Sequence, residues 1–197
     1  MKILIELPTW LGDCIMATPA IENIVNFYND VEITFIASFV SIEAMKYHPN
    51  VVKTVILDKK YGSLYKTAKG LGRFDAFYSF RSSFRSKFLK FFISAKNKHQ
   101  FDKNKYINCH QVKKYNDFVN DSLNIDSNSG RLKLYKQNQS SDVGQKPILG
   151  INPGASYGSA KRWYPEEFAK VASKLASQYD IVIFGGPGEK DIAMDIE

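Results

Sequence analysis

An acidic residue stands where the first buried strand of the chain is expected to end. Residues 2–7 (KILIEL) have the pattern of a short apolar strand, and the loop 8–13 (PTWLGD) follows it. In open α/β sheets, ligands bind at the carboxyl ends of the strands, so Asp13 is placed to face a cleft. Two compatible roles are predicted for Asp13: a general base for a substrate hydroxyl, or the N-cap of a helix that starts at Cys14.

A second candidate is the loop 152–163 (NPGASYGSAKRW). Its glycines allow the backbone to approach a ligand closely. Ser156, Tyr157 and backbone N–H groups can donate hydrogen bonds to phosphate oxygens, and Lys161 and Arg162 supply positive charge. The loop lacks GxxxxGK[ST], so it is not a P-loop. The alternative is a solvated glycine-rich turn that carries two cations.

Two further segments could bind a ligand or a surface. Glu189 follows a predicted strand in the loop 185–189 (GGPGE), where it either bonds a ribose hydroxyl or lies exposed on a turn. The segment 81–98 has six cations and no acid. A helix predicted at 83–95 would have one cationic and one aromatic face, which suits an anionic membrane; the alternative is a buried aromatic stripe with solvated lysines. The aromatic residues are Phe84, Phe88, Phe91 and Phe92.

The elements that must position these residues alternate between strand and helix, which predicts βαβ units and a largely parallel sheet. The polar segment 137–146 is the expected linker between a first domain at 1–136 and the start of a second at 147–197. Further strands are predicted at 31–39, 51–57, 74–80, 147–152 and 181–184, and further helices at 14–28, 63–70, 111–124 and 165–178.

Composition narrows the class of protein. The 197 residues are 44% hydrophobic and 24% charged, which excludes disorder, collagen and a disulfide-stapled miniprotein. The net charge of +7 is concentrated at 53–114, where 16 Lys and Arg face three acids, and this predicts an anionic partner. Two cysteines without metal-ligand spacing argue against zinc and suit a reducing compartment. With no apolar run near ~20 residues and no signal peptide, a cytoplasmic protein is expected.

Four segments together resemble the lipopolysaccharide heptosyltransferases. They are LPTWLGDCIMATPAI (7–21), SFRSSFRS (79–86), NPGASYGSAKRWYPEEFAKVA (152–172) and VIFGGPGEKD (182–191). The resemblance implies an α/β fold of GT-B type, in which a complete Rossmann-like N-terminal domain precedes a second one that is only partly present. It implies an inverting glycosyltransferase with ADP-heptose as donor and heptosyl-Kdo-lipid A as acceptor. The enzyme would need no metal or cofactor and would lie at the inner face of the inner membrane.

The resemblance also assigns roles to individual residues. Asp13 matches the catalytic base, and Lys161 matches the lysine that stabilises the leaving diphosphate. Ser156 and Tyr157 fall at loop positions that touch phosphate, and Glu189 matches an acid that holds the adenosine ribose.

On the acceptor side, Arg81 and Arg85 fall in the segment expected to meet the anionic acceptor. Family members continue to a later Asp-Ser/Thr-Gly-x-x-His-like segment that contacts the donor, and nothing like it occurs here, so an incomplete donor domain is expected. The alternative function is a non-catalytic remnant that binds anionic glycolipid. A nucleic-acid binder is disfavoured because no nucleic-acid motif accompanies the charge.

Overall fold

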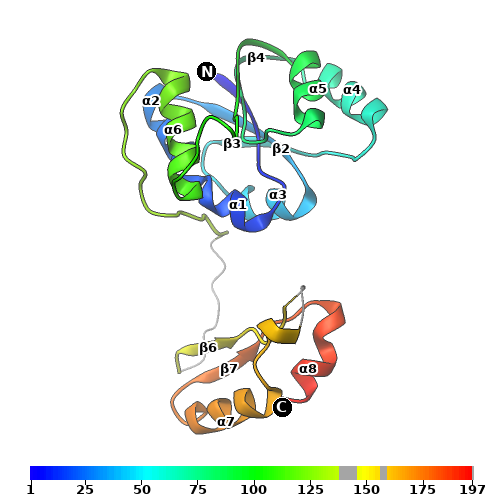
Figure 1. Cartoon of the computed structure of the whole chain (residues 1–197), viewed down its shortest axis with the longest axis vertical. Coiled ribbons are helices and arrows are strands. Elements are labelled where there is room, and N and C mark those ends of the chain that lie inside the picture. The colour runs from blue at the N-terminus through cyan, green and yellow to red at the C-terminus, as the bar shows by residue number, and fades with distance from the viewer. Residues whose placement is uncertain (138–145, 156–158, 197) are drawn as a thin grey trace. The chain divides into compact units, whose positions relative to one another are not determined.

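The computed structural model describes residues 1–137, 146–155 and 159–196. The chain folds as two units, Met1–Gln137 and Asn138–Glu197 (Figure 1). Most of the expected linker, 137–146, lies outside the described residues.

The first unit is built on a five-stranded sheet in which every neighbouring pair of strands is parallel. The order is β3-β2-β1-β4-β5. The chain therefore adds β2 and β3 on one side of β1, and then crosses to add β4 and β5 on the other side. The β1/β4 boundary is therefore the topological switch point, where open α/β sheets bind ligands beyond the strand ends. The strands are β1 (Lys2–Glu6), β2 (Glu32–Ala37), β3 (Val51–Ile56), β4 (Arg73–Ser79) and β5 (Ser94–Gln100).

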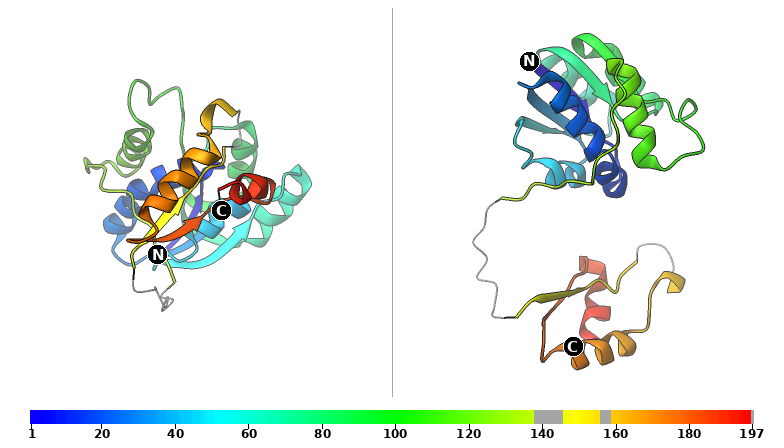
Figure 2. Two further views of the ribbon diagram at one scale, coloured as in Figure 1. Left: turned by 90° about the horizontal axis from the view of Figure 1, so that it is seen from below. Right: turned by 90° about the vertical axis from the view of Figure 1, so that its left-hand side faces the viewer.

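Helices cover both faces of this sheet, which makes its central strands apolar on both sides (Figure 2). Along β1, Ile3 and Ile5 pack into one core and Leu4 into the other. The larger core takes residues from α1, α2, α3 and α6, and the smaller takes residues from α4 and α5. The helices are α1 (Leu11–Met16), α2 (Thr18–Tyr28), α3 (Phe39–Met45), α4 (Tyr61–Gly70), α5 (Phe84–Phe92) and α6 (Gln111–Leu123).

The start of the first helix differs from the prediction. Trp10 occupies the N-cap position of α1, and Asp13 lies within the first helical turn without capping it. The N-cap role predicted for Asp13 is therefore wrong. The predicted helix 14–28 is also two helices, because a new one begins at Thr18 with Pro19 in its first turn. Proline has no N–H to donate and fits the first turn, where such a donor is not needed.

The aromatic helix also ends earlier than predicted. The prediction extends it to residue 95, but α5 ends at Phe92, Ile93 is extended, and β5 begins at Ser94. The sequence of β5, SAKNKHQ, has no apolar alternation, because β5 is an edge strand whose conformation comes from pairing with β4. Lysines on an edge strand are typical, since they discourage pairing with another chain.

The strand predicted at 31–39 is likewise shorter, and a helix follows it. β2 ends at Ala37, and Ser38 caps α3 by accepting a hydrogen bond from the Ser41 backbone N–H at 3.5 Å. Apolar residues Phe39 and Val40 continue the apolar run into the first turn of α3, where both are exposed. Because the apolar residues continue past the end of β2, the sequence pattern does not show where the strand ends and the helix begins.

The second unit has a two-stranded parallel sheet, β6 (Ile148–Ile151) and β7 (Asp180–Ile183). The connection between the strands contains α7 (Pro165–Leu175), which begins with proline as predicted. A short helical turn, η1 (Ser159–Lys161), precedes α7; a second turn, η2 (Pro187–Glu189), and α8 (Lys190–Met194) follow β7. Both predicted ligand loops thus follow the carboxyl ends of parallel strands.

Candidate active site

Asp13 lines a pocket of about 200 Å³ at the switch point of the first unit. The loop after β1 and the first turn of α1 contribute one wall, and the loop after β4 contributes another, so Asp13 and Arg81 line the same pocket. Tyr115 of α6 also lines it, and burial together with the Asp13 carboxylate raises the pKa of Tyr115. The full lining is Pro8, Thr9, Trp10, Asp13, Phe80, Arg81, Ser82, Ser83, Phe101 and Tyr115.

A buried carboxylate stands behind Arg81. Glu6, the last residue of β1, is only 1% exposed, and its Oε1 lies 3.3 Å from Nη1 of Arg81. Ser79 Oγ donates to Oε2 at 2.6 Å, and Ser86 Oγ donates to Oε1 at 2.9 Å. Burial raises the pKa of Glu6, while Arg81 and the two hydroxyl donors oppose that rise. The carboxylate therefore joins β1, β4 and α5 beside the pocket. Glu6 is not among the site residues predicted from the sequence.

Arg85 takes a different position from Arg81. Its guanidinium donates to the backbone oxygen of Asp58, in the connection between β3 and α4. It is not among the residues that line the Asp13 pocket. The Arg85 Nε atom is buried without a hydrogen-bond partner among the described residues. Of the two predicted acceptor residues, the fold brings Arg81 to Asp13 and turns Arg85 toward the β3–α4 connection.

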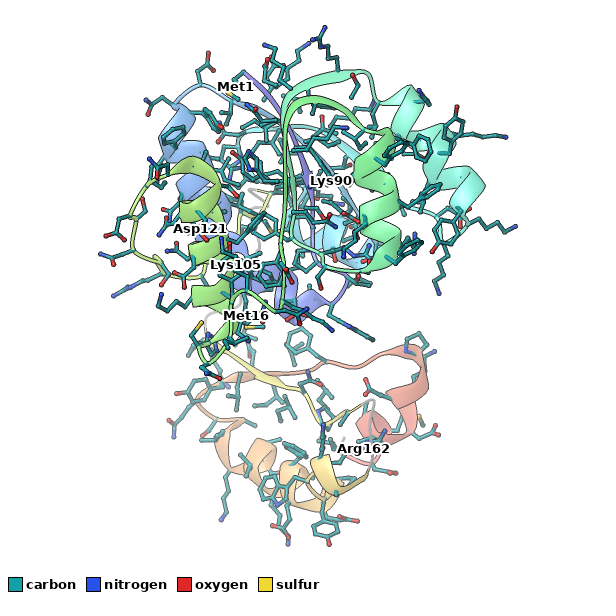
Figure 3. All side chains as sticks on the ribbon, turned by 45° about the horizontal axis from the view of Figure 1, so that its top comes forward. Met1, Met16, Lys90, Lys105, Asp121 and Arg162 are labelled. Carbon is teal, nitrogen blue, oxygen red and sulfur yellow. The ribbon has the colours of Figure 1, made fainter. Side chains whose placement is uncertain are left out.

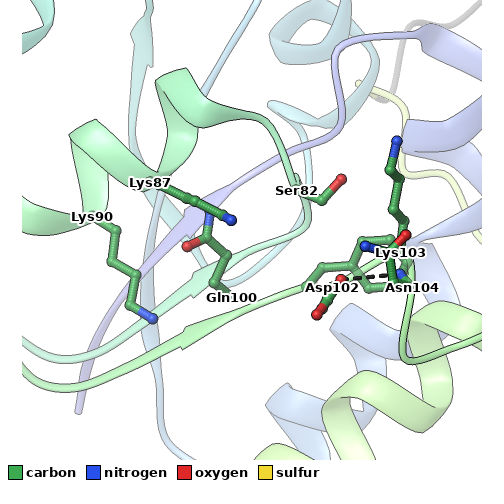
Figure 4. A pocket seen from close by; sticks show the side chains of 8 residues that line it. Ser82, Lys87, Lys90, Gln100, Asp102, Lys103 and Asn104 are labelled. Atoms are coloured by element: carbon green, nitrogen blue, oxygen red, sulfur yellow. Dashed lines mark hydrogen bonds between the residues drawn. The ribbon is translucent and has the colours of Figure 1, made fainter.

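A second pocket, of about 250 Å³, adjoins the first: Ser82 and Phe101 line both. Lys87 and Lys90 extend into it from α5, and Lys103 lies in the opposite wall (Figure 4). We call it the lysine pocket; Gln100, Asp102 and Asn104 complete its lining. Three lysines and one aspartate make it cationic. Lys103 is not a predicted site residue, because it comes from a loop whose place beside α5 depends on the unrecognised strand β5.

The loop that carries Lys103 is tied to α6. The Lys105 ammonium lies 2.6 Å from Oδ2 of Asp121, and the Tyr106 hydroxyl donates to the same oxygen at 2.8 Å. Figure 3 shows Lys105 of this loop beside Asp121 of α6. At the start of the loop, the Asn104 backbone N–H donates to Oδ1 of Asp102 at 2.9 Å. These bonds give the far wall of the lysine pocket a definite conformation.

In the second unit, the loops after β6 and β7 meet at Glu189. Its Oε2 accepts a hydrogen bond from the Gly186 N–H at 2.7 Å. Its Oε1 occupies the space beside Gly154, where an added Cβ would lie 1.8 Å away. The predicted ribose-binding acid is therefore in contact with the predicted phosphate loop.

The two cations of that loop have different surroundings. Arg162 donates from Nε and Nη2 to the Ala155 backbone oxygen, at 3.3 and 2.9 Å, so it holds the loop from within. Lys161 ends η1 with an exposed side chain. Ser156 and Tyr157 lie outside the described residues.

Two further findings concern metals and membranes. Within the described residues, no three or more His, Cys, Asp or Glu side chains gather as a metal site. Among the described helices, none is both long and apolar enough to cross a membrane.

Comparison with known proteins gives a consistent result. The model of glycosyltransferase family 9 (heptosyltransferase) matches residues 64–197. Lipooligosaccharide heptosyltransferase 2 of Campylobacter jejuni serotype O:2 is 44% identical over 205 residues, and that of serotype O:6 is 41% identical over 203. Both alignments include the whole of this chain, which spans 63% and 64% of the two relatives. The solved Escherichia coli ADP-heptose lps heptosyltransferase II has a TM-score of 0.77 at 20% identity, covering 100% of this chain and 68% of that one.

The fold is thus α/β of the GT-B type found in glycosyltransferases, with the second unit present in part. Within that class, the chain belongs to glycosyltransferase family 9, the heptosyltransferases.

Proposed function

We propose that this chain belongs to an inverting heptosyltransferase that moves heptose from ADP-heptose to heptosyl-Kdo-lipid A. The names of its relatives support heptose as the sugar and lipooligosaccharide as the product. The name of the solved Escherichia coli protein includes ADP-heptose, which supports the donor. The observation that carries the proposal is the pocket at the switch point, which has both Asp13 and Arg81 in its lining. One carboxylate beside one cation suits a hydroxyl acceptor that also carries negative charge.

In this proposal, Asp13 is the general base. Inversion requires a single displacement at the anomeric carbon, so the acceptor oxygen attacks as ADP departs from the opposite side. The Asp13 carboxylate accepts the proton of the attacking hydroxyl. Its half-buried position, beside Phe80 and Tyr115, limits the number of water molecules that compete for that proton.

The donor is assigned to the second unit. Negative charge grows on the diphosphate as it leaves, and a preorganised cation or N–H donor stabilises that charge. Lys161 is the proposed cation, because its side chain is exposed while Arg162 is engaged with the Ala155 carbonyl. Glu189 is the proposed partner of the ribose hydroxyls, and Ser156 and Tyr157 are proposed donors to phosphate.

The acceptor is assigned to the first unit. Because Glu6 is paired with Arg81, much of the Arg81 charge is already balanced. The adjoining lysine pocket supplies further cations for a carboxylate or phosphate group of the acceptor. Arg85 is proposed to contribute through the orientation of α5 and the charge of the region.

A membrane surface is the proposed location of the acceptor. Phe84 and Phe91 of α5 are 76% and 78% exposed, whereas Leu89 of the same helix is buried. Two exposed aromatic side chains beside Lys87 suit the headgroup region of an anionic bilayer. We therefore propose a cytoplasmic enzyme, peripheral at the inner face of the inner membrane.

Heptose transfer to heptosyl-Kdo-lipid A tests the proposal. The assay uses the 197-residue chain and, in parallel, this chain joined to the remaining donor unit of the Campylobacter jejuni relative. We expect Asp13→Asn to lower turnover about 10²–10⁴-fold, which is the usual contribution of general-base catalysis. Asp30→Asn, an exposed change beyond the end of α2, is the matched control. Turnover close to that of the unsubstituted enzyme would exclude Asp13 as the base, and no transfer by either protein would contradict the function.

A further inference from the structure

An ionisable side chain, that of Glu6, is buried at the carboxyl end of the central strand β1. Glu6 points to the same face of β1 as Leu4, since side chains alternate along a strand, and Leu4 belongs to the smaller apolar core. Burying a carboxylate is unfavourable unless it is paired and hydrogen-bonded. Well-packed apolar residues often replace a buried ion pair without loss of stability, so stability alone gives little reason for Glu6.

The hydrogen bonds of Glu6 are concentrated on one loop. Ser79 ends β4, Arg81 follows it, and Ser86 lies in the first turn of α5. All three donate to the one carboxylate, which uses both of its oxygens. The loop between β4 and α5 is therefore fastened at its beginning, at Arg81 and at its end.

The backbone at Arg81 is held as well. The Gln100 side-chain amide donates to the Arg81 carbonyl at 3.1 Å, and the Arg81 N–H donates to Ser79 Oγ at 3.4 Å. The Arg81 side chain is 17% exposed and lines the Asp13 pocket. A guanidinium has five N–H donors, and the contact with Glu6 uses one terminal nitrogen. Other donors of Arg81 can meet a ligand in the pocket.

From this arrangement we propose that Glu6 is a positioning residue, which holds Arg81 in the orientation that places an anionic acceptor beside Asp13. This inference rests on the proposed function, because it assumes that Arg81 binds the acceptor. Glu6 itself does not touch the acceptor. Its role is to fix the direction of the guanidinium, and a misplacement of about 1 Å at a reacting centre can reduce turnover about 10²-fold.

The variant Glu6→Gln keeps the side-chain size and an oxygen acceptor but removes the charge that orients Arg81. Two effects on acceptor affinity then oppose each other: Arg81 regains its full charge for the acceptor, and it loses its fixed direction. We therefore expect the acceptor KM to change less than about threefold, while turnover falls about tenfold. Glu32→Gln, at the exposed first position of β2, is the matched control and should change neither value.

A double-mutant cycle separates positioning from general stabilisation, because residues that act through one another are not additive. In an Arg81→Ala background, Glu6→Gln should cause no further loss of turnover. An equal loss with and without Arg81 would overturn the proposal. If Glu6→Gln fails to fold, Ser86→Ala is used in the same cycle, and a loss that does not depend on Arg81 has the same meaning.

A measurement without acceptor distinguishes failure of this inference from failure of the proposed function. The Nη–H signals of Arg81, whose Nη1 contacts Glu6, are followed by NMR in the 197-residue chain at about pH 7. We expect Glu6→Gln to speed their exchange with water at least tenfold, and the control variant to leave it unchanged. Unchanged Arg81 signals would overturn the positioning role even if the enzyme transfers heptose. Faster exchange in Glu6→Gln, in a chain without transferase activity, would support the positioning role of Glu6 and contradict only the proposed function.

Discussion

The carboxylate of Glu189 lies directly against Gly154, on the loop that follows the neighbouring strand. A Cβ added at Gly154 would lie 1.8 Å from Oε1, and Oε2 accepts the Gly186 N–H at 2.7 Å. Gly154 thus leaves the space that the acid occupies. The contact joins two loops that are about 30 residues apart in sequence and both follow parallel strands.

Gly154→Ala should therefore displace the Glu189 carboxylate without unfolding the unit. The clash falls on the end of a flexible side chain rather than on backbone. We expect ADP affinity, measured by calorimetry, to fall about tenfold, with a change in unfolding free energy below about 1 kcal/mol, as for substitutions away from a packed core. Gly188→Ala, where nothing lies within 4 Å of the added Cβ, is the control. Unchanged ADP binding would separate Glu189 from the donor site.

Removing cations from the lysine pocket should weaken binding of the acceptor. For Lys87→Ala combined with Lys103→Ala, we expect a rise of about tenfold in the acceptor KM, with turnover within about twofold. The effect should shrink as salt rises from about 0.05 to 0.5 M, because ions screen exposed charges. Lys66→Ala with Lys69→Ala, two exposed lysines of α4, removes the same charge from the first unit. An equal rise in KM in both double variants would show that acceptor binding depends on the net charge of the unit and not on the lysine pocket.

The exposed aromatic residues of α5 give a test of membrane binding. Phe84→Ser with Phe91→Ser should reduce sedimentation with phosphatidylglycerol-containing vesicles at least threefold, because each ring adds buried apolar area in the headgroup region. Both side chains are more than three-quarters exposed, so the free energy of unfolding should change little. Tyr164→Ser, a 72% exposed aromatic in the second unit, is the control. Unreduced sedimentation would exclude this face as the membrane contact.

Glu6 should give the stability of the first unit a pH dependence opposite to that from an acid whose pKa is lowered by folding. Burial is the largest influence on its pKa and raises it above the usual 4.5, against the opposing effects of Arg81, Ser79 and Ser86. The folded state therefore keeps the Glu6 proton to a higher pH than the unfolded state does. Stability relative to Glu6→Gln should fall as pH rises from about 4.5 through the raised pKa. The loss is about 1.4 kcal/mol for each pH unit that separates the folded-state pKa from the unfolded-state pKa.

Urea denaturation of both proteins between about pH 4 and pH 7 measures this difference, and comparing the two variants cancels the titration of all other groups. A constant difference in the free energy of unfolding across that range would show that burial does not raise the pKa of Glu6. A difference that grows in favour of the unsubstituted chain would show that Arg81 and the serines dominate.

Local sequence patterns were sufficient for the parallel α/β class and for most of its elements. Alternation of apolar strands with amphipathic helices needs only local periodicity, and the helix predicted at 111–124 matches α6 to within one residue at its end. The glycine-rich loops and Asp13 could also be located, because each follows an apolar strand. The family followed from four segments in order along the chain, without any knowledge of contacts.

The tertiary structure, and not the local sequence, determined which of these residues lie close together. β5 has no apolar pattern and is a strand because β4 lies beside it, so the place of Lys103 could not be read locally. Arg81 and Arg85 look equivalent in the sequence, yet one lines the same pocket as Asp13 and the other binds the Asp58 carbonyl. In the sequence Glu6 is only a charge near the end of a short apolar strand, and the packing of β4 and α5 against β1 makes it a buried partner of Arg81. Such contacts depend on distance in space, which local sequence patterns do not contain.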